Sequence, residues 1–360
     1  MAGNTLVDGH LMHAFANLPP IPVRHGVTRD IFVREIMPRG EPVVLKGLVA
    51  DWPAVSAARE GTAGMAGYLS GFDNGRPAET IFGPPEIGGR FFYSDDLKGL
   101  NFIRRPETIS RTLGGLARLE QDREPPSVYI QSVPVPDHLP GFMEGNQLNL
   151  PPDGTQPRIW IGNRLSVQTH FDLSENIACV AAGRRRFTLI PPSQLPNLYV
   201  GPFELTLAGP PVSLVRPEAW DADKYPLFAD ALKHARSATL EPGDAIYIPY
   251  CWWHHVESLT PFNVLVNYWW TDARADLGSP FDAMLHGLIA LRDLPPEQRR
   301  VWKTFFDHYV FGEHGDPVSH LPADVRGALG PHTPEMRKRL KMTLLTSLAA
   351  ALGLAPPPMN

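Results

Sequence analysis

The chain has 360 residues, of which 43% are hydrophobic and 20% are charged, and its formal net charge is -5. This balance is ordinary for a soluble globular protein, and it includes no broad basic field that would make nucleic acid an evident partner. The two cysteines, Cys179 and Cys251, argue against a disulfide scaffold and predict a reducing compartment, with the cytoplasm as the default. Residues 1–18 lack the apolar core of a signal peptide, and no apolar stretch is long enough to span a membrane.

The predicted elements fall into three parts along the chain. The first third mixes helical patterns with Gly-Pro turns, and in it we expect a helix over residues 30–36 and short strands over 42–46 and 90–93. The central part is rich in strands, which we place at residues 128–130, 158–161, 166–182, 185–190, 245–248 and 264–270. Turn residues separate these strands, as is typical of an antiparallel barrel or sandwich. Beyond residue 273, amphipathic helices are predicted at residues 281–292, 296–309 and 333–352.

A possible metal site is encoded by His170 and Asp172, with His254 and His255 following about eighty residues later. Two histidines and one carboxylate hold one face of a divalent iron and leave the opposite positions open. On an extended strand His170 and Asp172 project from the same face, because side chains alternate. Either His254 or His255 can complete the set, since neighbours point to opposite faces. Core histidines and a chance His-x-Asp pair are the alternative, but the joint pattern favours a metal.

An inward-facing cation is predicted next to this motif. If a hairpin turns at Gly183, then Arg185 faces the same interior as His170. A buried guanidinium requires an anion, and a carboxylate can bind it through two parallel hydrogen bonds. An internal salt bridge to Glu175 or Glu257 is the alternative. We favour a bound ligand, because the strand of Arg185 is expected to lie beside the metal-binding strand.

These motifs together resemble the JmjC and cupin-like family of Fe(II)- and 2-oxoglutarate-dependent oxygenases. In motif the chain is most similar to the asparaginyl hydroxylase group that acts on hypoxia-inducible factor. The resemblance covers about residues 20–270 and is carried by residues 169–172, 183–187, 243–249, 252–259 and 266–269. It implies a mainly β fold with flanking helices, a double-stranded β-helix or jelly roll, over residues 1–275. Residues 276–360 would form a C-terminal helical extension in the family's dimerisation position, and therefore a homodimer.

Carried over residue by residue, the resemblance assigns roles in the site. It implies that Fe(II) is bound by His170, Asp172 and His254, whereas His255 is a packing residue. It implies that 2-oxoglutarate is held by Arg185, Tyr129, Asn176 and Asn267. Two positions depart from the family pattern: Arg185 replaces a lysine, and Val167 replaces a threonine. Arginine keeps the charge but is bulkier and fork-shaped, so the co-substrate could be held differently.

The activity implied is hydroxylation of a peptide side chain or a small molecule, with O2 consumed and succinate and CO2 released. We expect Gln131, Trp253 and Trp269 to line the substrate pocket. Asparagine specificity is not transferred, because Pro211 and Val212 stand where the hydroxylases have polar substrate-binding residues. Two alternatives remain at this point: a metal-dependent cupin that does not use 2-oxoglutarate, and a non-catalytic dimeric interaction protein.

Overall fold

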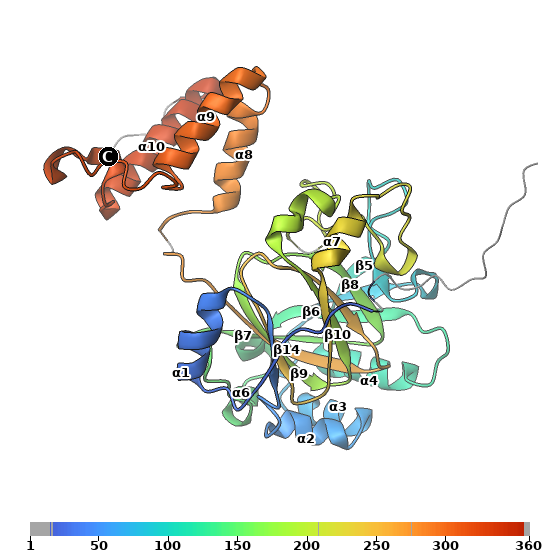
Figure 1. Cartoon of the computed structure of the whole chain (residues 1–360). Helices are drawn as coiled ribbons and strands as arrows, with labels where there is room; N and C mark the ends of the chain where they lie inside the picture. The colour runs from blue at the N-terminus through green and yellow to red at the C-terminus, as the bar shows by residue number, and fades with distance from the viewer. Residues whose placement is uncertain (1–14, 16, 208, 275, 356–360) are drawn as a thin grey trace, which may run out of the picture. The chain divides into compact units, whose positions relative to one another are not determined.

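The computed structural model describes residues 15, 17–207, 209–274 and 276–355. It divides the chain into two compact units, Met1–Thr271 and Asp272–Asn360. From the sequence we predict a domain boundary between residues 275 and 276, and the structure places this boundary directly after Thr271. The first unit is mainly β and the second is helical (Figure 1).

Two sheets make up the centre of the first unit. The nine-stranded sheet has the order β1-β2-β12-β9-β14-β7-β6-β3-β5, and the five-stranded sheet has the order β11-β10-β13-β8-β4. The larger sheet comprises β1 (Val23–His25), β2 (Val43–Lys46), β3 (Ala78–Gly83), β5 (Ile103–Glu107), β6 (Ser127–Pro134), β7 (Pro157–Gly162), β9 (Glu175–Ala182), β12 (Ala245–Ile248) and β14 (Asn263–Trp270). The smaller sheet comprises β4 (Arg90–Phe91), β8 (Leu165–His170), β10 (Arg185–Ile190), β11 (Arg236–Leu240) and β13 (Trp253–Ser258).

The two sheets pack face to face, and their inner faces share one hydrophobic core. Val180 of β9 and Leu265 of β14 meet Phe187 of β10 and Val256 of β13 in this core. Within the described residues neither sheet closes on itself, so the architecture is an open sandwich rather than a sealed barrel. The predicted fold class, mainly β of the jelly-roll type with flanking helices and a C-terminal helical extension, is confirmed.

Helices cover the outer face of the larger sheet (Figure 1). Side chains alternate along β9, so Ala178 and Val180 face the inner core while Ile177 and Cys179 face a second core. That second core is completed by α2 (Pro53–Arg59), α3 (Thr62–Ser70) and α4 (Ile109–Leu119). The N-terminus of α4 is capped by the Thr108 hydroxyl, which accepts a hydrogen bond from the backbone N–H of Arg111. Both faces of the larger sheet are therefore buried near its centre.

The remaining helices of the first unit are short. The predicted helix over residues 30–36 is present as α1 (Arg29–Ile31) followed by a single π-helical turn, Phe32–Ile36. The others are α5 (Val135–His138), α6 (Phe142–Gly145), α7 (Phe228–His234) and the 3-10 turns Met37–Arg39, Pro85–Ile87, Pro192–Asn197 and Pro217–Ala219. Strands β3 and β5 were not predicted, because the first third of the chain reads as a mixture of helices and turns.

Two strand predictions need correction. The stretch from residue 166 to 182 is not one strand, because β8 ends at His170 and β9 begins at Glu175. The hairpin predicted at Gly183 is also wrong, since β9 belongs to the larger sheet and β10 to the smaller one. Gly183 instead carries the chain between the sheets with φ 74°, and an added Cβ would lie 2.4 Å from the carbonyl oxygen of Phe262. Only glycine fits this crossing.

In its described residues the second unit has three α-helices: α8 (Pro280–Leu291), α9 (Pro296–Tyr309) and α10 (Pro334–Ala351). Two 3-10 turns, Ala323–Val325 and Gly327–Leu329, lie between α9 and α10. Ser279 and Thr333 cap α8 and α10 through their hydroxyl groups. Among the helices in the described ranges, none has the length and apolar character needed to cross a membrane.

Candidate metal centre

Two neighbouring strands of the smaller sheet bring the predicted metal ligands together. His170 at the end of β8 is directly opposite His254 of β13, and their ring centroids are 4.2 Å apart. Asp172 lies two residues beyond the end of β8, and its Oδ2 is 3.5 Å from Nε2 of His254. One candidate ligand atom from each residue lies within 4.8 Å of the others. Two imidazoles and one carboxylate at this separation can bind one divalent metal from one side.

Backbone carbonyls orient both imidazole rings. Nδ1 of His170 is 2.8 Å from the carbonyl oxygen of Gln168, and Nδ1 of His254 is 3.0 Å from that of Trp252. A carbonyl oxygen only accepts hydrogen bonds, so each Nδ1 carries the proton and each Nε2 presents its lone pair to the centre. Burial, together with the neighbouring His170, lowers the pKa of His254 to about 4. The ring is therefore neutral at physiological pH, as a metal ligand must be.

The carboxylate ligand has a hydrogen-bond donor of its own. Nε1 of Trp269 donates to Oδ2 of Asp172 over 3.1 Å. Such a contact restricts the rotation of the carboxylate and helps to hold it in a binding orientation. Trp269 is half-buried on β14, in the opposite sheet, so the metal centre depends on both layers of the sandwich.

The structure distinguishes His254 from its neighbours on β13. His255 points away from the metal group, lies 3.3 Å from the Thr169 hydroxyl and packs edge-on against Phe15. Trp253 also lies on this outer side and packs against Phe171. The expectation that Trp253 lines the substrate pocket is therefore wrong, because alternation along the strand directs it away from the face that carries His254.

A buried arginine lies in the same interior. Arg185 begins β10, beside the strand of His254 rather than that of His170, and is only 1% exposed. Its Nε and Nη2 have no hydrogen-bond partner among the described residues. The Tyr129 hydroxyl interacts with the guanidinium, and burial lowers the pKa of Arg185 while it raises that of Tyr129.

The expected alternative of an internal salt bridge to Arg185 is not observed. Glu257 pairs with Arg186, with 2.5 Å between Oε2 and Nε, and Glu175 accepts a hydrogen bond from the Tyr247 hydroxyl at 2.6 Å. Both carboxylates therefore already have partners elsewhere. A buried cation with two unused donors is costly, so this arrangement is suited to an incoming anion.

Two amide side chains line the inner chamber together with Arg185 and Tyr129. Nδ2 of Asn267 donates to Oδ1 of Asn176 over 3.2 Å, and Oδ1 of Asn267 accepts from Nε1 of Trp160 over 2.7 Å. These bonds define the orientation of the Asn267 amide, and hence which of its atoms face the chamber. All four residues to which the family resemblance gives a role in co-substrate binding thus line one chamber beside His170, Asp172 and His254.

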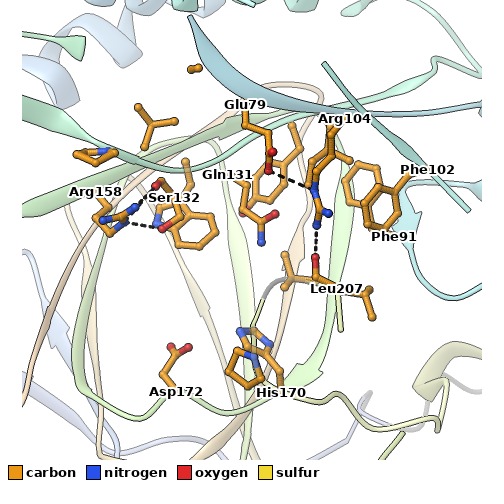
Figure 2. Close-up of a pocket in the computed structure, with 18 of the residues that line it drawn as sticks. Glu79, Phe91, Phe102, Arg104, Gln131, Ser132, Arg158, His170, Asp172 and Leu207 are labelled. Carbon is orange, nitrogen blue, oxygen red and sulfur yellow. Dashed lines mark hydrogen bonds and ion pairs between the residues drawn. The ribbon is translucent and has the colours of Figure 1, made fainter. Parts of the chain in front are cut away.

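A wider cavity of about 570 Å³ opens above His170 and Asp172. Figure 2 shows the two ligands at its floor, with Glu79, Arg104, Gln131, Ser132 and Arg158 above them. Gln131 and Trp269, which we expect in a substrate pocket, both line this cavity. Sequence reasoning missed Arg104 and Arg158, although Arg158 falls on a predicted strand two residues before Trp160 and so shares its face. An arginine on the inner face of a predicted buried strand could have identified Arg158 as a residue that lines the cavity.

Comparison with known proteins agrees with this geometry. Residues 28–276 match the family described as the cupin-like domain. The chain belongs to the cupin-like domain family. The matched region contains the smaller sheet, every strand of the larger sheet except β1, and all three residues of the candidate metal centre.

The relatives of this cupin-like chain carry different names. It is 26% identical over 277 residues to tRNA wybutosine-synthesizing protein 5 of Gallus gallus, covering 71% of this chain and 78% of the relative. It is 32% identical over 157 residues to HSPB1-associated protein 1 of Homo sapiens, covering 42% of this chain and 31% of the relative. It is 25% identical over 260 residues to Jumonji C domain-containing protein 5 of Drosophila melanogaster, covering 69% of this chain and 59% of the relative. The chain thus spans less than a third of the human relative's length and most of the chicken relative's.

Proposed function

We propose that this chain is an Fe(II)- and 2-oxoglutarate-dependent dioxygenase that hydroxylates a peptide side chain or a small molecule. In the overall reaction one atom of O2 enters the hydroxylated product and the other enters succinate, while the 2-oxo acid loses CO2. One observation carries the proposal: the ligand group of His170, Asp172 and His254 shares an interior with the partnerless donors of Arg185. A metal alone would not explain the buried guanidinium.

The donor set fits a ferrous ion. Nε2 of His170, Nε2 of His254 and a carboxylate oxygen of Asp172 would hold it, and the remaining coordination positions would face the cavity. Bound there, the ion supplies the activation of O2. The protein's part is to fix the imidazole tautomers through the carbonyls of Gln168 and Trp252 and to exclude bulk water from the inner chamber.

The inner chamber fits the far carboxylate of 2-oxoglutarate. Nε and Nη2 of Arg185 form one edge of the guanidinium, which can donate two parallel hydrogen bonds to a carboxylate. The Tyr129 hydroxyl would donate a third. Asn176 and Asn267 would line the path between this carboxylate and the metal. Arginine in place of the family lysine therefore preserves the charge and supplies a forked donor.

Conversion of 2-oxoglutarate to succinate tests this activity without a known substrate. Oxygenases of this class turn over the co-substrate slowly in an uncoupled reaction, so purified protein with Fe(II), O2 and 2-oxoglutarate should release succinate. Asp172→Ala should abolish the release, whereas His255→Gln, which alters a histidine outside the ligand group, should retain it. Equal succinate release by the wild type and Asp172→Ala would contradict the proposal.

We also propose that the second unit forms a homodimer in the cytoplasm. No residue of α8 or α9 is buried, and Ile289 is 77% exposed. Exposed apolar surface of this extent on a helical unit favours a protein partner. Both cysteines are free, which is consistent with a reducing compartment. Light scattering that shows only monomers at tens of micromolar protein would contradict the dimer.

A further inference from the structure

The charges that line the outer cavity are unbalanced. The cavity lining contains three arginines: Arg76, Arg104 and Arg158. Apart from the proposed metal ligand Asp172, its only carboxylate among the described residues is that of Glu79. Once a divalent metal, dianionic 2-oxoglutarate and Arg185 are counted with Asp172, the inner site is close to neutral. The outer cavity then keeps an excess of positive charge, which favours an anionic occupant.

Two of these arginines already have carboxylate partners. Nε of Arg104 lies 3.2 Å from Oε1 of Glu79, and Nη2 of the same guanidinium donates to the carbonyl oxygen of Leu207. Nη1 of Arg76 lies 3.7 Å from Oδ2 of Asp137. Figure 2 shows the contacts of Arg104 on the side of the cavity that carries Phe91 and Phe102. Arg104 and Arg76 are therefore largely neutralised.

Arg158 differs from both. Its Nε donates to the Ser132 hydroxyl over 2.6 Å, and its Nη2 donates to the Ser132 carbonyl over 2.6 Å. In the described part of the chain no carboxylate lies within ion-pair distance of it, although Asp137 acts on it electrostatically from farther away. Its guanidinium lies over the Trp269 ring at 5.9 Å, and Trp269 in turn donates to Asp172. Arg158 thus brings a positive charge that has no ion-pair partner among the described residues close to the open side of the candidate metal centre.

A strained backbone holds this arrangement in place. Ser132 has φ 55°, in the left-handed region that serine rarely adopts, and it belongs to a bulge where β6 shifts register against β7. The bulge directs both the carbonyl and the hydroxyl of Ser132 to Arg158, which itself pairs with Pro134 across the strands. These two bonds occupy one edge of the guanidinium and leave Nη1 for another acceptor. The strained conformation of Ser132 is explained if the Arg158 guanidinium must be oriented toward a ligand.

We propose that the primary substrate carries a carboxylate or phosphate group that Arg158 binds above the metal, and an apolar part that contacts the aromatic wall. This inference rests on the proposed oxygenase activity. Phe91 and Phe102 form that wall, with ring centroids 5.3 Å apart, on the side of the cavity opposite Arg158 (Figure 2). An amphipathic acid would bridge these two sides and place the C–H bonds next to its anionic group above His170 and Asp172.

Matched pairs of probes test this assignment by calorimetry. N-acetylphenylalanine is compared with its neutral amide, and phenyl phosphate with phenol, on protein loaded with Mn(II) and saturating 2-oxoglutarate. Saturation matters because it occupies Arg185, which would otherwise bind the acids itself. At least one acid should bind about tenfold or more tightly than its neutral partner, since a hydrogen bond to a charged group gains that much. Whichever pair discriminates identifies carboxylate or phosphate as the anion.

Variants separate recognition from folding. Arg158→Gln should reduce the discrimination to less than twofold while the affinity for 2-oxoglutarate stays unchanged, and Arg24→Gln, on an exposed edge strand, should alter neither. Equal binding of acids and neutral partners by the wild type, discrimination that persists in Arg158→Gln, or no acid binding at 10 mM would each overturn the inference. If 2-oxoglutarate fails to bind but acids bind through Arg158, the proposed oxygenase activity fails and the anion site stands.

Discussion

Replacing Arg185 with methionine should change ligand affinity and protein stability in opposite directions. Methionine keeps an unbranched, though shorter, side chain and removes the charge and all the hydrogen-bond donors. In the proposed complex Nε and Nη2 each donate to the far carboxylate of 2-oxoglutarate. Hydrogen bonds to charged groups contribute roughly 1.5 kcal/mol or more each, so losing two costs about 3 kcal/mol. That loss corresponds to an affinity for 2-oxoglutarate that is about a hundredfold weaker.

The ligand-free variant should be more stable than the wild type. Arg185 is 1% exposed and its Nε and Nη2 have no partner among the described residues, so folding desolvates them without compensation. Each unsatisfied buried donor costs roughly 1–3 kcal/mol, and the interaction with Tyr129 offsets part of this. Removing the guanidinium should therefore raise the free energy of unfolding by about 2 kcal/mol. Wild-type protein should regain stability when 2-oxoglutarate is added, and the variant should not.

Two measurements on the same preparations check this prediction. Calorimetry with Mn(II)-loaded protein gives the dissociation constant of 2-oxoglutarate, and urea unfolding of metal-free protein gives the stability. Arg184→Met is the matched control, because the neighbouring Arg184 is half-exposed and pairs with Glu241; it should leave the affinity unchanged. An unchanged affinity in Arg185→Met would refute the carboxylate assignment. A less stable ligand-free variant would show instead that Arg185 has a structural partner.

Three further predictions concern the metal centre and the helical unit. Trp269→Phe removes the hydrogen bond to Asp172 and should weaken metal affinity about tenfold in a chelator competition, whereas no change would make that bond irrelevant. His255→Phe should leave metal affinity within threefold of wild type, while His254→Ala should abolish binding; the reverse pattern would exchange their roles. Ile289→Glu should convert the proposed dimer to a monomer in light scattering without changing succinate release, and a dimer that persists would place the interface elsewhere.

The candidate ligands His170 and Asp172 were predictable because a His-x-Asp motif is a local property of the sequence. Alternation along an extended strand predicts both side chains on one face, but β8 ends at His170, so Asp172 joins the group from the segment beyond the strand. The choice between His254 and His255 was not local. It depends on the register of β13 against β8, which places His254 opposite His170, and a bulge between His254 and Val256 then shifts the pairing. The family resemblance favoured His254, and the structure places that histidine with the other two ligands.

The direction of Arg185 was predicted correctly for a partly wrong reason. A tight glycine turn between two apolar segments reads as a hairpin, and the hairpin rule placed Arg185 inward. In fact β9 is buried on both faces, so its sequence does not indicate whether the next strand pairs with it or belongs to the other sheet. Gly183 crosses between the sheets, and Arg185 faces inward because both inner faces meet in one core.

The outer cavity could not be predicted from local patterns. Its walls combine β3, β5, β6 and β7 with the segment that contains Leu207, so they come from separate regions of the chain. The bulge at Ser132 requires a left-handed residue that is not glycine, and nothing in the sequence marks it. Arg104 looks like an ordinary surface residue until strand pairing directs it over the candidate metal centre.

Anaerobic addition of Fe(II) and 2-oxoglutarate tests whether the protein binds both in one site. Chelation of the metal by the 2-oxo acid produces a visible metal-to-ligand charge-transfer band, which reports that both partners share one site. We expect this band for the wild type, its absence in Asp172→Ala, and its appearance in Arg185→Met only at much higher 2-oxoglutarate. Wild-type protein that binds Fe(II) but shows no band at millimolar 2-oxoglutarate would refute a shared site for iron and 2-oxoglutarate.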